Sequence, residues 1–180
     1  MDIDTRLHDI AARLERLRKL DRSRWRVIGR ATRRSVFGAD HHQYRSEPLS
    51  EDQLCALERA MGVALPSDFR AFLHRIGTGA GPFYGISRFD ALMAGATPDC
   101  AHPFPPAEQG PYFDDEGDEA VHGHLPIIDE GCGWEVYLIT AGAHRGRVFT
   151  LDLDHRWTVG PDFLTHYEDW LDRTTRGLGR

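Results

Sequence analysis

The candidates for catalysis in this chain are one of its three cysteines and three of its ten histidines. Cys132 lies between two glycines, and His122, His124 and His144 are close to it in the sequence. A nucleophilic cysteine needs a neighbouring base and a lowered pKa, which a helix N-terminus or a cationic neighbour provides. Cys132 instead begins a strand-like segment, where a small thiol suits close packing of the backbone. We therefore expect a structural role for Cys132, and a thiol hydrolase is the alternative.

A metal site is the second chemistry to test. His122 and His124 are two residues apart and could project from the same side of a strand, with Asp114 or Asp118 beside them. Zinc ligands usually come as two pairs, and no second pair accompanies these histidines. We expect no metal, no cofactor and no catalytic residue. The sequence thus favours a protein that is not an enzyme, with a metal hydrolase using His122 and His124 as the alternative.

Charge is unevenly distributed along the 180 residues. The net charge is −6, but residues 1–34 hold eleven Lys or Arg and five Asp or Glu, which gives +6 there and −12 in the other 146 residues. An acidic body repels nucleic acid and attracts a cationic partner. No apolar run approaches the roughly 18 residues of a membrane helix, and the N-terminal residues do not resemble a signal peptide. We expect a cytoplasmic protein with a protein partner, and neither nucleic acid nor membrane as a partner.

The N-terminal segment, residues 1–24, is predicted to form an amphipathic helix. Its apolar residues recur at steps of three and four and so share one helix face: Leu7, Ile10, Leu14, Leu17 and Leu20. Arg13, Arg16 and Lys19 lie off that face. We expect them to form a solvated surface, and a phosphate-binding face is the alternative.

Two more helices follow close together. Ser50 and Gln53 have the spacing of a capping box for a helix that starts at Glu51, and Gly62 is the expected stop. The next helix has Pro66 in an early position, and Gly77 ends it. The glycine-rich stretch 77–85 closes a helix rather than opening one, so we expect a chain reversal there and not a nucleotide-binding loop.

The C-terminal half changes to an alternating pattern. Residues 134–139 and 147–153 alternate with a period of two and predict a hairpin that turns at 141–146. Residues 157–159 are expected to add a strand that Gly160 and Pro161 end, and Asp162 can cap a final helix. Residues 95–124, rich in Pro, Gly and acidic side chains, predict a long surface loop.

This order of elements predicts an α+β fold. We expect a single domain at residues 25–175, with a largely antiparallel central sheet packed against helices. Residues 1–24 are the helical extension, and residues 176–180 are expected to be a tail.

Three separated blocks of this sequence resemble the SUKH superfamily, in particular its Smi/Knr (cell-wall-assembly regulator) branch as found in bacteria. The blocks are "LPSDFRAFL", "GAGPFYG" and "LPIIDEGCG", and the resemblance runs from about residue 25 to residue 173. The residues that match the family blocks, and that the resemblance implies are structural, are Pro66, Asp68, Phe69, Gly81, Pro82, Tyr84, Gly85, Asp129, Gly131, Cys132 and Gly133. The chain departs from the family pattern at Glu130, where glutamine is common, and at Thr78, where asparagine is usual.

The resemblance implies a protein-binding function. Many bacterial members act as immunity proteins that neutralise toxins, often nucleases, and fungal members act as interaction proteins in cell-wall regulation. On that basis we expect an immunity protein that binds a cationic toxin domain, with a regulatory scaffold as the alternative.

The densest run of carboxylates is the expected contact with that partner. It lies in the predicted surface loop and comprises Asp114, Asp115, Glu116, Asp118 and Glu119. A solubilising loop is the alternative, because acidic runs are usually solvated. Glu135 and Tyr137, on one face of the predicted sheet, are the second candidate surface.

Overall fold

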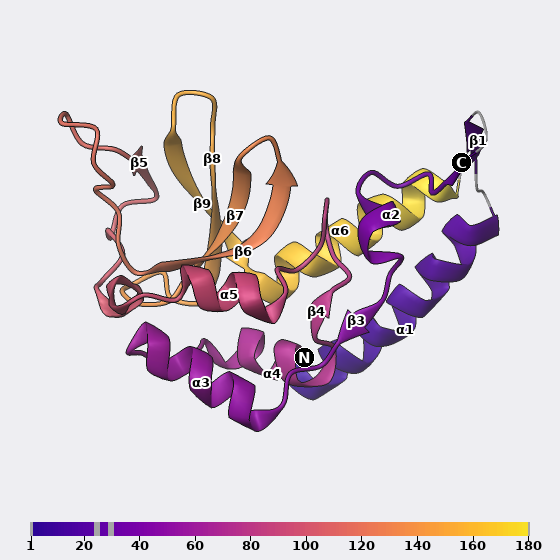
Figure 1. The fold of residues 1–180 in the computed structure, drawn as a ribbon, viewed down its shortest axis with the longest axis horizontal. Helices are drawn as coiled ribbons and strands as arrows, with labels where there is room; N and C mark the ends of the chain where they lie inside the picture. The colour runs from indigo at the N-terminus through magenta and orange to yellow at the C-terminus, as the bar shows by residue number, and fades with distance from the viewer. Residues whose placement is uncertain (1, 24–25, 29–30, 180) are drawn as a thin grey trace.

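The computed structural model describes residues 2–23, 26–28 and 31–179 and has an α+β fold, as the sequence predicts (Figure 1). A five-stranded antiparallel sheet has the order β5-β9-β8-β7-β6. Its strands are β5 (Gln109–Pro111), β6 (His124–Gly131), β7 (Trp134–Ile139), β8 (Arg147–Leu151) and β9 (Arg156–Asp162). Two short pairs complete the strands: β1 (Arg26–Ile28) with β2 (Ala31–Arg33), and β3 (Ser46–Glu47) with β4 (Thr78–Gly79).

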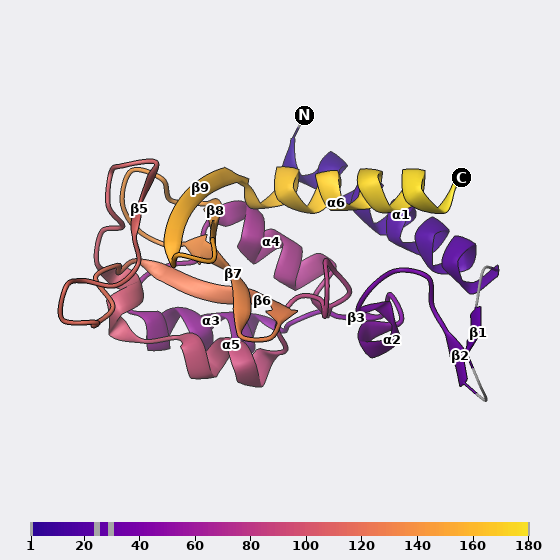
Figure 2. The ribbon, with the colours of Figure 1, turned by 90° about the horizontal axis from the view of Figure 1, so that it is seen from above.

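The helices gather along one side of the sheet and beyond its end, as Figures 1 and 2 show. They are α1 (Ile3–Ser23), α2 (Ala39–His42), α3 (Glu51–Met61), α4 (Ser67–Arg75), α5 (Phe89–Gly95), the 3-10 helix η1 (Pro98–Ala101) and α6 (Phe163–Leu178). The capping box of α3 forms as predicted, with Ser50 and Gln53 bonded reciprocally, and Gly62 ends the helix in the left-handed conformation. None of the helices in the described part of the chain combines the length and apolar character that a bilayer crossing needs.

Both faces of the sheet are covered. Val136 and Leu138 of β7 enter the main core, which the helices share. Tyr137 and Ile139 point to the opposite face, where a second and smaller apolar cluster forms with the rings of Phe104, Tyr112, Phe149 and Trp157. The alternation that predicted two faces is therefore confirmed, but the second face carries a core and not an open surface.

The predicted N-terminal helix forms, and it is part of the main core. Leu7, Ile10 and Leu17 are at most 1% exposed and belong to the same cluster as the apolar side chains of α4 and α6. Two of its arginines form ion pairs with the last helix: Arg6 binds Glu168 of α6 at 2.8 Å, and Arg13 binds Asp172. The expected solvated face is thus partly an ion-paired contact with the last helix.

Two predicted boundaries are wrong. Strand β9 continues through Gly160 and Pro161 to Asp162, because an irregularity between Arg147 and Phe149 of β8 lets the pairing resume beyond them. Helix α6 continues to Leu178, whose side chain is buried, so residue 176 does not begin a tail.

The segment predicted as a long loop is partly ordered into elements. Residues 95–124 contain η1 and strand β5, which adds an edge strand to the sheet beside β9. Residue 25, where the family resemblance was expected to begin, lies outside the described residues.

Candidate functional site

The second and third family blocks meet at the edge of the sheet. The Tyr84 backbone amide donates to the Asp129 carbonyl at 3.2 Å, and a Cβ at Gly131 would lie 2.7 Å from the Tyr84 ring. Gly85 has a φ of +96°, and a Cβ there would lie 1.7 Å from the Gly79 carbonyl oxygen. These glycines are therefore required by close backbone and ring contacts, which agrees with the structural role that the resemblance implies.

The first family block builds the core. Phe69 of α4 is fully buried and packs edge-to-face on Phe163 of α6, with ring centroids 4.7 Å apart. Pro66 is the residue before α4, and Asp68 lies in its first turn, where a carboxylate is favourable.

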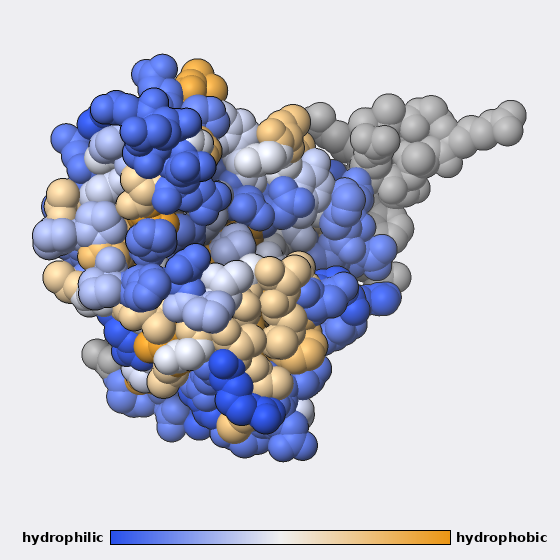
Figure 3. Space-filling view, turned by 60° about the vertical axis from the view of Figure 1, so that its left-hand side comes forward, coloured by the Kyte–Doolittle hydropathy of each residue, from blue (hydrophilic) through white to orange (hydrophobic). Residues whose placement is uncertain are grey.

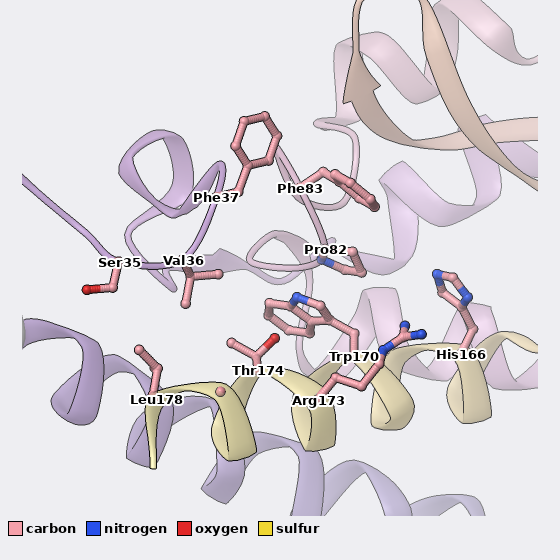
Figure 4. Close-up of a pocket in the computed structure, with 11 residues that line it drawn as sticks. Ser35, Val36, Phe37, Pro82, Phe83, His166, Trp170, Arg173, Thr174 and Leu178 are labelled. Carbon is pink, nitrogen blue, oxygen red and sulfur yellow. The ribbon is translucent and has the colours of Figure 1, made fainter. Parts of the chain in front are cut away.

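An apolar groove of about 900 Å³ lies beside the second block (Figure 4). Trp170, Arg173 and other residues of α6 form one side, and the segments containing Phe37 and Phe83 form the other. The Phe37 side chain is 65% exposed and that of Phe83 is 39% exposed, and their ring centroids are 6.3 Å apart. Exposed aromatic rings next to Trp and Arg have the composition of protein-binding hot spots.

His166 gives this groove an uncharged polar group. Its Nε2 is buried and has no hydrogen-bond partner among the described residues. Burial lowers the pKa of His166, and the charge of Arg173 acts in the same direction, so the ring is neutral at pH 7.

The acidic loop is exposed and held in a tight turn. All five predicted carboxylate residues are exposed. The Asp114 carboxylate accepts hydrogen bonds from the backbone amides of Glu116 and Asp118 at 3.0 and 2.9 Å, and the Asp114 amide donates to the Asp118 carbonyl. Figure 3, in which this end of the molecule is turned forward, shows a mostly hydrophilic surface. Asp114 therefore shapes the turn, Asp115, Glu116 and Asp118 face solvent, and Glu119 lines the cavity at the base of the loop.

A small cavity of about 360 Å³ lies at the base of this loop. Its lining includes Tyr112, His124, Glu135 and Tyr137, and the Tyr112 hydroxyl lies 3.0 Å from His124 Nε2. Burial lowers the pKa of His124 to about 4 and raises the pKa of Glu135. Tyr137, which belongs to the second candidate surface, is only 9% exposed and stacks on Phe149. Its side chain therefore offers little area for direct contact with a partner.

The structure separates Cys132 from all three candidate bases. Gly131 pairs with Trp134 at one end of the β6–β7 hairpin, and His124 pairs with Ile139 at the other. At about 3.3 Å per residue the two ends are about 20 Å apart. His122 precedes β6 and His144 follows β7, so both lie beyond the His124 end. The pair of Cys132 with His122, His124 or His144 that the thiol-hydrolase alternative requires cannot form in this arrangement.

Cys132 also differs from the packing role that the sequence suggested. It is exposed, has a φ of +56°, and shares a two-residue turn with Gly133, whose φ is +83°. Positive φ at both central residues defines a type I′ hairpin turn, where Asn-Gly or Asp-Gly is preferred. The thiol therefore sits at the tip of the turn and fills no core space.

The pairing of His122 with His124 that the metal-hydrolase alternative requires does not occur either. The His124 ring is partly buried and lines the cavity, whereas His122 is exposed and faces the Asp99 carboxylate, with Nδ1 4.0 Å from the nearer oxygen. His102 contacts the same oxygen at 3.2 Å. The structure thus assembles a different group of possible ligands, Asp99, His102 and His122, in which the first two are remote from the third in sequence.

The protein is thus a small α+β protein whose antiparallel sheet is covered on both faces. Its exposed features are the acidic loop and the groove with Phe37 and Phe83. A family model described as the SMI1 / KNR4 family (SUKH-1) matches residues 48–173. The chain belongs to this family, as the three sequence blocks indicated. Neither the comparison with curated proteins nor the comparison with solved structures found a match.

Sequence reasoning found the acidic loop and the family blocks but missed the groove. Phe37 and Phe83 are far from Trp170 and Arg173 of α6 in the sequence, so only the chain reversal at 81–85 and the docking of α6 bring these three segments together. Pro82 and Phe83 lie inside a family block, and that was the local signal for this surface.

Proposed function

We propose that this protein is an immunity protein that binds and neutralises a cationic toxin domain. Membership of the SMI1 / KNR4 family supports a protein-binding role, and the acidic body supports a cationic partner. A nuclease is the toxin class that fits best, because an enzyme that holds a polyanion presents a positive surface.

The observation that carries the proposal is the exposed acidic loop. It presents Asp115, Glu116 and Asp118 to solvent, and none of these carboxylates forms an ion pair with another residue in the described part of the chain. Unpaired carboxylates on a tight turn raise the association rate with a positive surface and require little reorganisation on binding. We therefore assign the contact to this loop, and we assign Glu135 and Tyr137 a supporting position at its base.

Co-expression tests the immunity function. We expect the reading frame adjacent to this gene to encode a secreted toxin, and we expect this protein to restore growth to bacteria that express its toxin domain. Continued toxicity with stable, soluble protein would contradict the immunity function. A metabolic enzyme as the neighbour would instead favour the regulatory scaffold.

A charge variant tests the assigned contact. The triple variant D115N/E116Q/D118N removes three charges and leaves the turn-forming Asp114 intact. We expect slower association with the toxin domain and a weaker dependence on salt, because exposed charges steer encounter. The melting temperature should barely change, since exposed charges contribute little to stability.

Two controls make the charge experiment specific. The matched variant D52N/D90N/D169N removes the same number of exposed charges from α3, α5 and α6 and should leave association close to wild type. The variant F37A alters the apolar groove, which is lined by α6 and the segments containing Phe37 and Phe83. In Figures 1 and 2 the C-terminal half of α6 lies at the opposite end of the molecule from β5, which the acidic loop follows. If F37A weakens binding and the loop triple variant does not, the groove is the interface and the assigned contact is wrong.

A further inference from the structure

We propose that Asp99, His102 and His122 form a binding site for a divalent transition metal ion of the zinc type. Each residue offers one ligand atom, and the three atoms lie within 4.8 Å of one another. Two imidazoles with one carboxylate suit Zn²⁺, whereas Mg²⁺ and Ca²⁺ prefer oxygen ligands. This site adjoins the proposed toxin contact but uses none of the residues assigned to it.

The backbone holds the two segments that carry these residues close together. The Gly123 amide donates to the Asp99 carbonyl at 3.0 Å, and the His102 amide donates to the same carbonyl at 3.0 Å. A Cβ on Gly123, whose φ is +72°, would lie 2.3 Å from the His102 carbonyl oxygen. Glycine is therefore needed where the chain before β6 crosses η1, and this crossing places His122 beside the other two residues.

The side chains already converge on one carboxylate. The nearer Asp99 oxygen lies 3.2 Å from His102 Nδ1 and 4.0 Å from His122 Nδ1, and the two imidazole rings are in edge contact with centroids 5.6 Å apart. No Lys or Arg among the described residues forms an ion pair with Asp99. The carboxylate is therefore not neutralised by a fixed cation, and a bound metal ion would supply that charge.

The geometry needs only small side-chain movements. Ligand distances of about 2.0–2.1 Å in a tetrahedral site place ligand atoms about 3.4 Å apart. All three side chains are exposed and can move by the required amount without disturbing the core. Three protein ligands also leave a fourth position for water, and this position is near the cavity at the base of the acidic loop, because Asp99 and His122 line that cavity as well.

Calorimetric titration with ZnCl₂ tests the site. Protein stripped with a chelator and exchanged into metal-free buffer should bind one Zn²⁺ per chain and show a higher melting temperature with excess metal, because the ion joins two segments of the fold. Loss of a residue that supports a metal ligand lowers metal affinity roughly 10- to 100-fold, and loss of the ligand itself should lower it at least as much. We therefore expect H102A and H122A each to weaken Zn²⁺ binding by at least about tenfold. The matched control is H8A, which removes an exposed histidine of α1 outside the group.

Two results would overturn the proposal. One is the absence of Zn²⁺ binding to wild-type protein at micromolar concentration. The other is binding that H102A and H122A leave unchanged, which would place the ion elsewhere. Because both variants alter exposed side chains, a far-ultraviolet circular dichroism spectrum equal to that of wild type should accompany them, and D99N provides a third variant if either fails to fold.

Discussion

At the scale of single residues, Cys132 adopts the left-handed backbone conformation, with a φ of +56°, which is unfavourable for a residue with a side chain. An L-residue pays roughly 1–2 kcal/mol for the left-handed conformation, and Asn tolerates that conformation better than Cys. We expect Cys132→Asn to raise the free energy of unfolding by about 0.5–1 kcal/mol, and Cys132→Ala to leave partner binding unchanged. Urea unfolding measures the first effect. A clear loss of stability in C132N would mean that the thiol makes a contact that matters.

A second residue, His42, makes stability depend on pH. Burial lowers the pKa of His42 to about 4, and the charge of Arg34 acts in the same direction. Its Nδ1 accepts a hydrogen bond from the Tyr44 amide at 3.0 Å, so the ring is held in its neutral form.

The sign of the effect follows from the depressed pKa. The unfolded chain binds a proton on His42 below pH 6.5, whereas the folded protein binds it only near pH 4. Stability should therefore fall as the pH falls from 6.5 to 4, by up to about 3 kcal/mol from this residue. His42→Asn keeps an acceptor for the Tyr44 amide and should flatten the slope in that window by about one proton. Chemical unfolding at several pH values measures the slope, and an equal slope in both proteins would show that His42 does not titrate in this way.

At the scale of elements, the N-terminal helix is the clearest case of a segment whose role changes with tertiary context. Its apolar face lies in the main core, and two of its arginines, Arg6 and Arg13, pair with α6. Ion pairs with carboxylates of α6 thus neutralise part of the excess positive charge in residues 1–34. We infer that α1 is an integral layer of the domain and not a separable extension.

Truncation of one α1 side chain tests this inference. Ile10 is fully buried, and truncating a buried Ile costs about 2–5 kcal/mol because it removes apolar contacts and leaves a cavity. Ile10→Ala should lower the free energy of unfolding by that amount, while Arg16→Ala, an exposed control on the same helix, should change it by less than about 0.5 kcal/mol. A cost near zero for I10A would restore the view of α1 as an independent extension.

At the scale of the whole molecule, the acidic loop and the apolar groove are formed by different elements. In Figures 1 and 2, β5, which the acidic loop follows, and the C-terminal half of α6 lie at opposite ends of the molecule. The acidic loop follows β5, the zinc-type group lies at η1 and just before β6, and the apolar groove lies beside the C-terminal half of α6. Because these surfaces share no residues, variants in one should not affect binding at the other. The loop and groove variants can therefore locate the interface without first disturbing the fold.

The sequence by itself determined the local elements and the family. The capping box at Ser50, the period of two in 134–139 and the cap at Asp162 each depend on neighbours within a few residues, so their structures follow from local hydrogen bonding and spacing. The three family blocks could be recognised for the same reason, since each is a continuous stretch. The fold class followed from the order of these elements.

Only the tertiary structure decided which side chains share a site. His122 meets Asp99 and not His124, because the chain crosses η1 at Gly123, whereas His124 begins β6 and its ring lines the cavity. The sheet face with Tyr137 is covered by residues that no local pattern links to it. Contacts between distant segments depend on how whole elements pack, and a sequence pattern describes only the face that each element offers for packing.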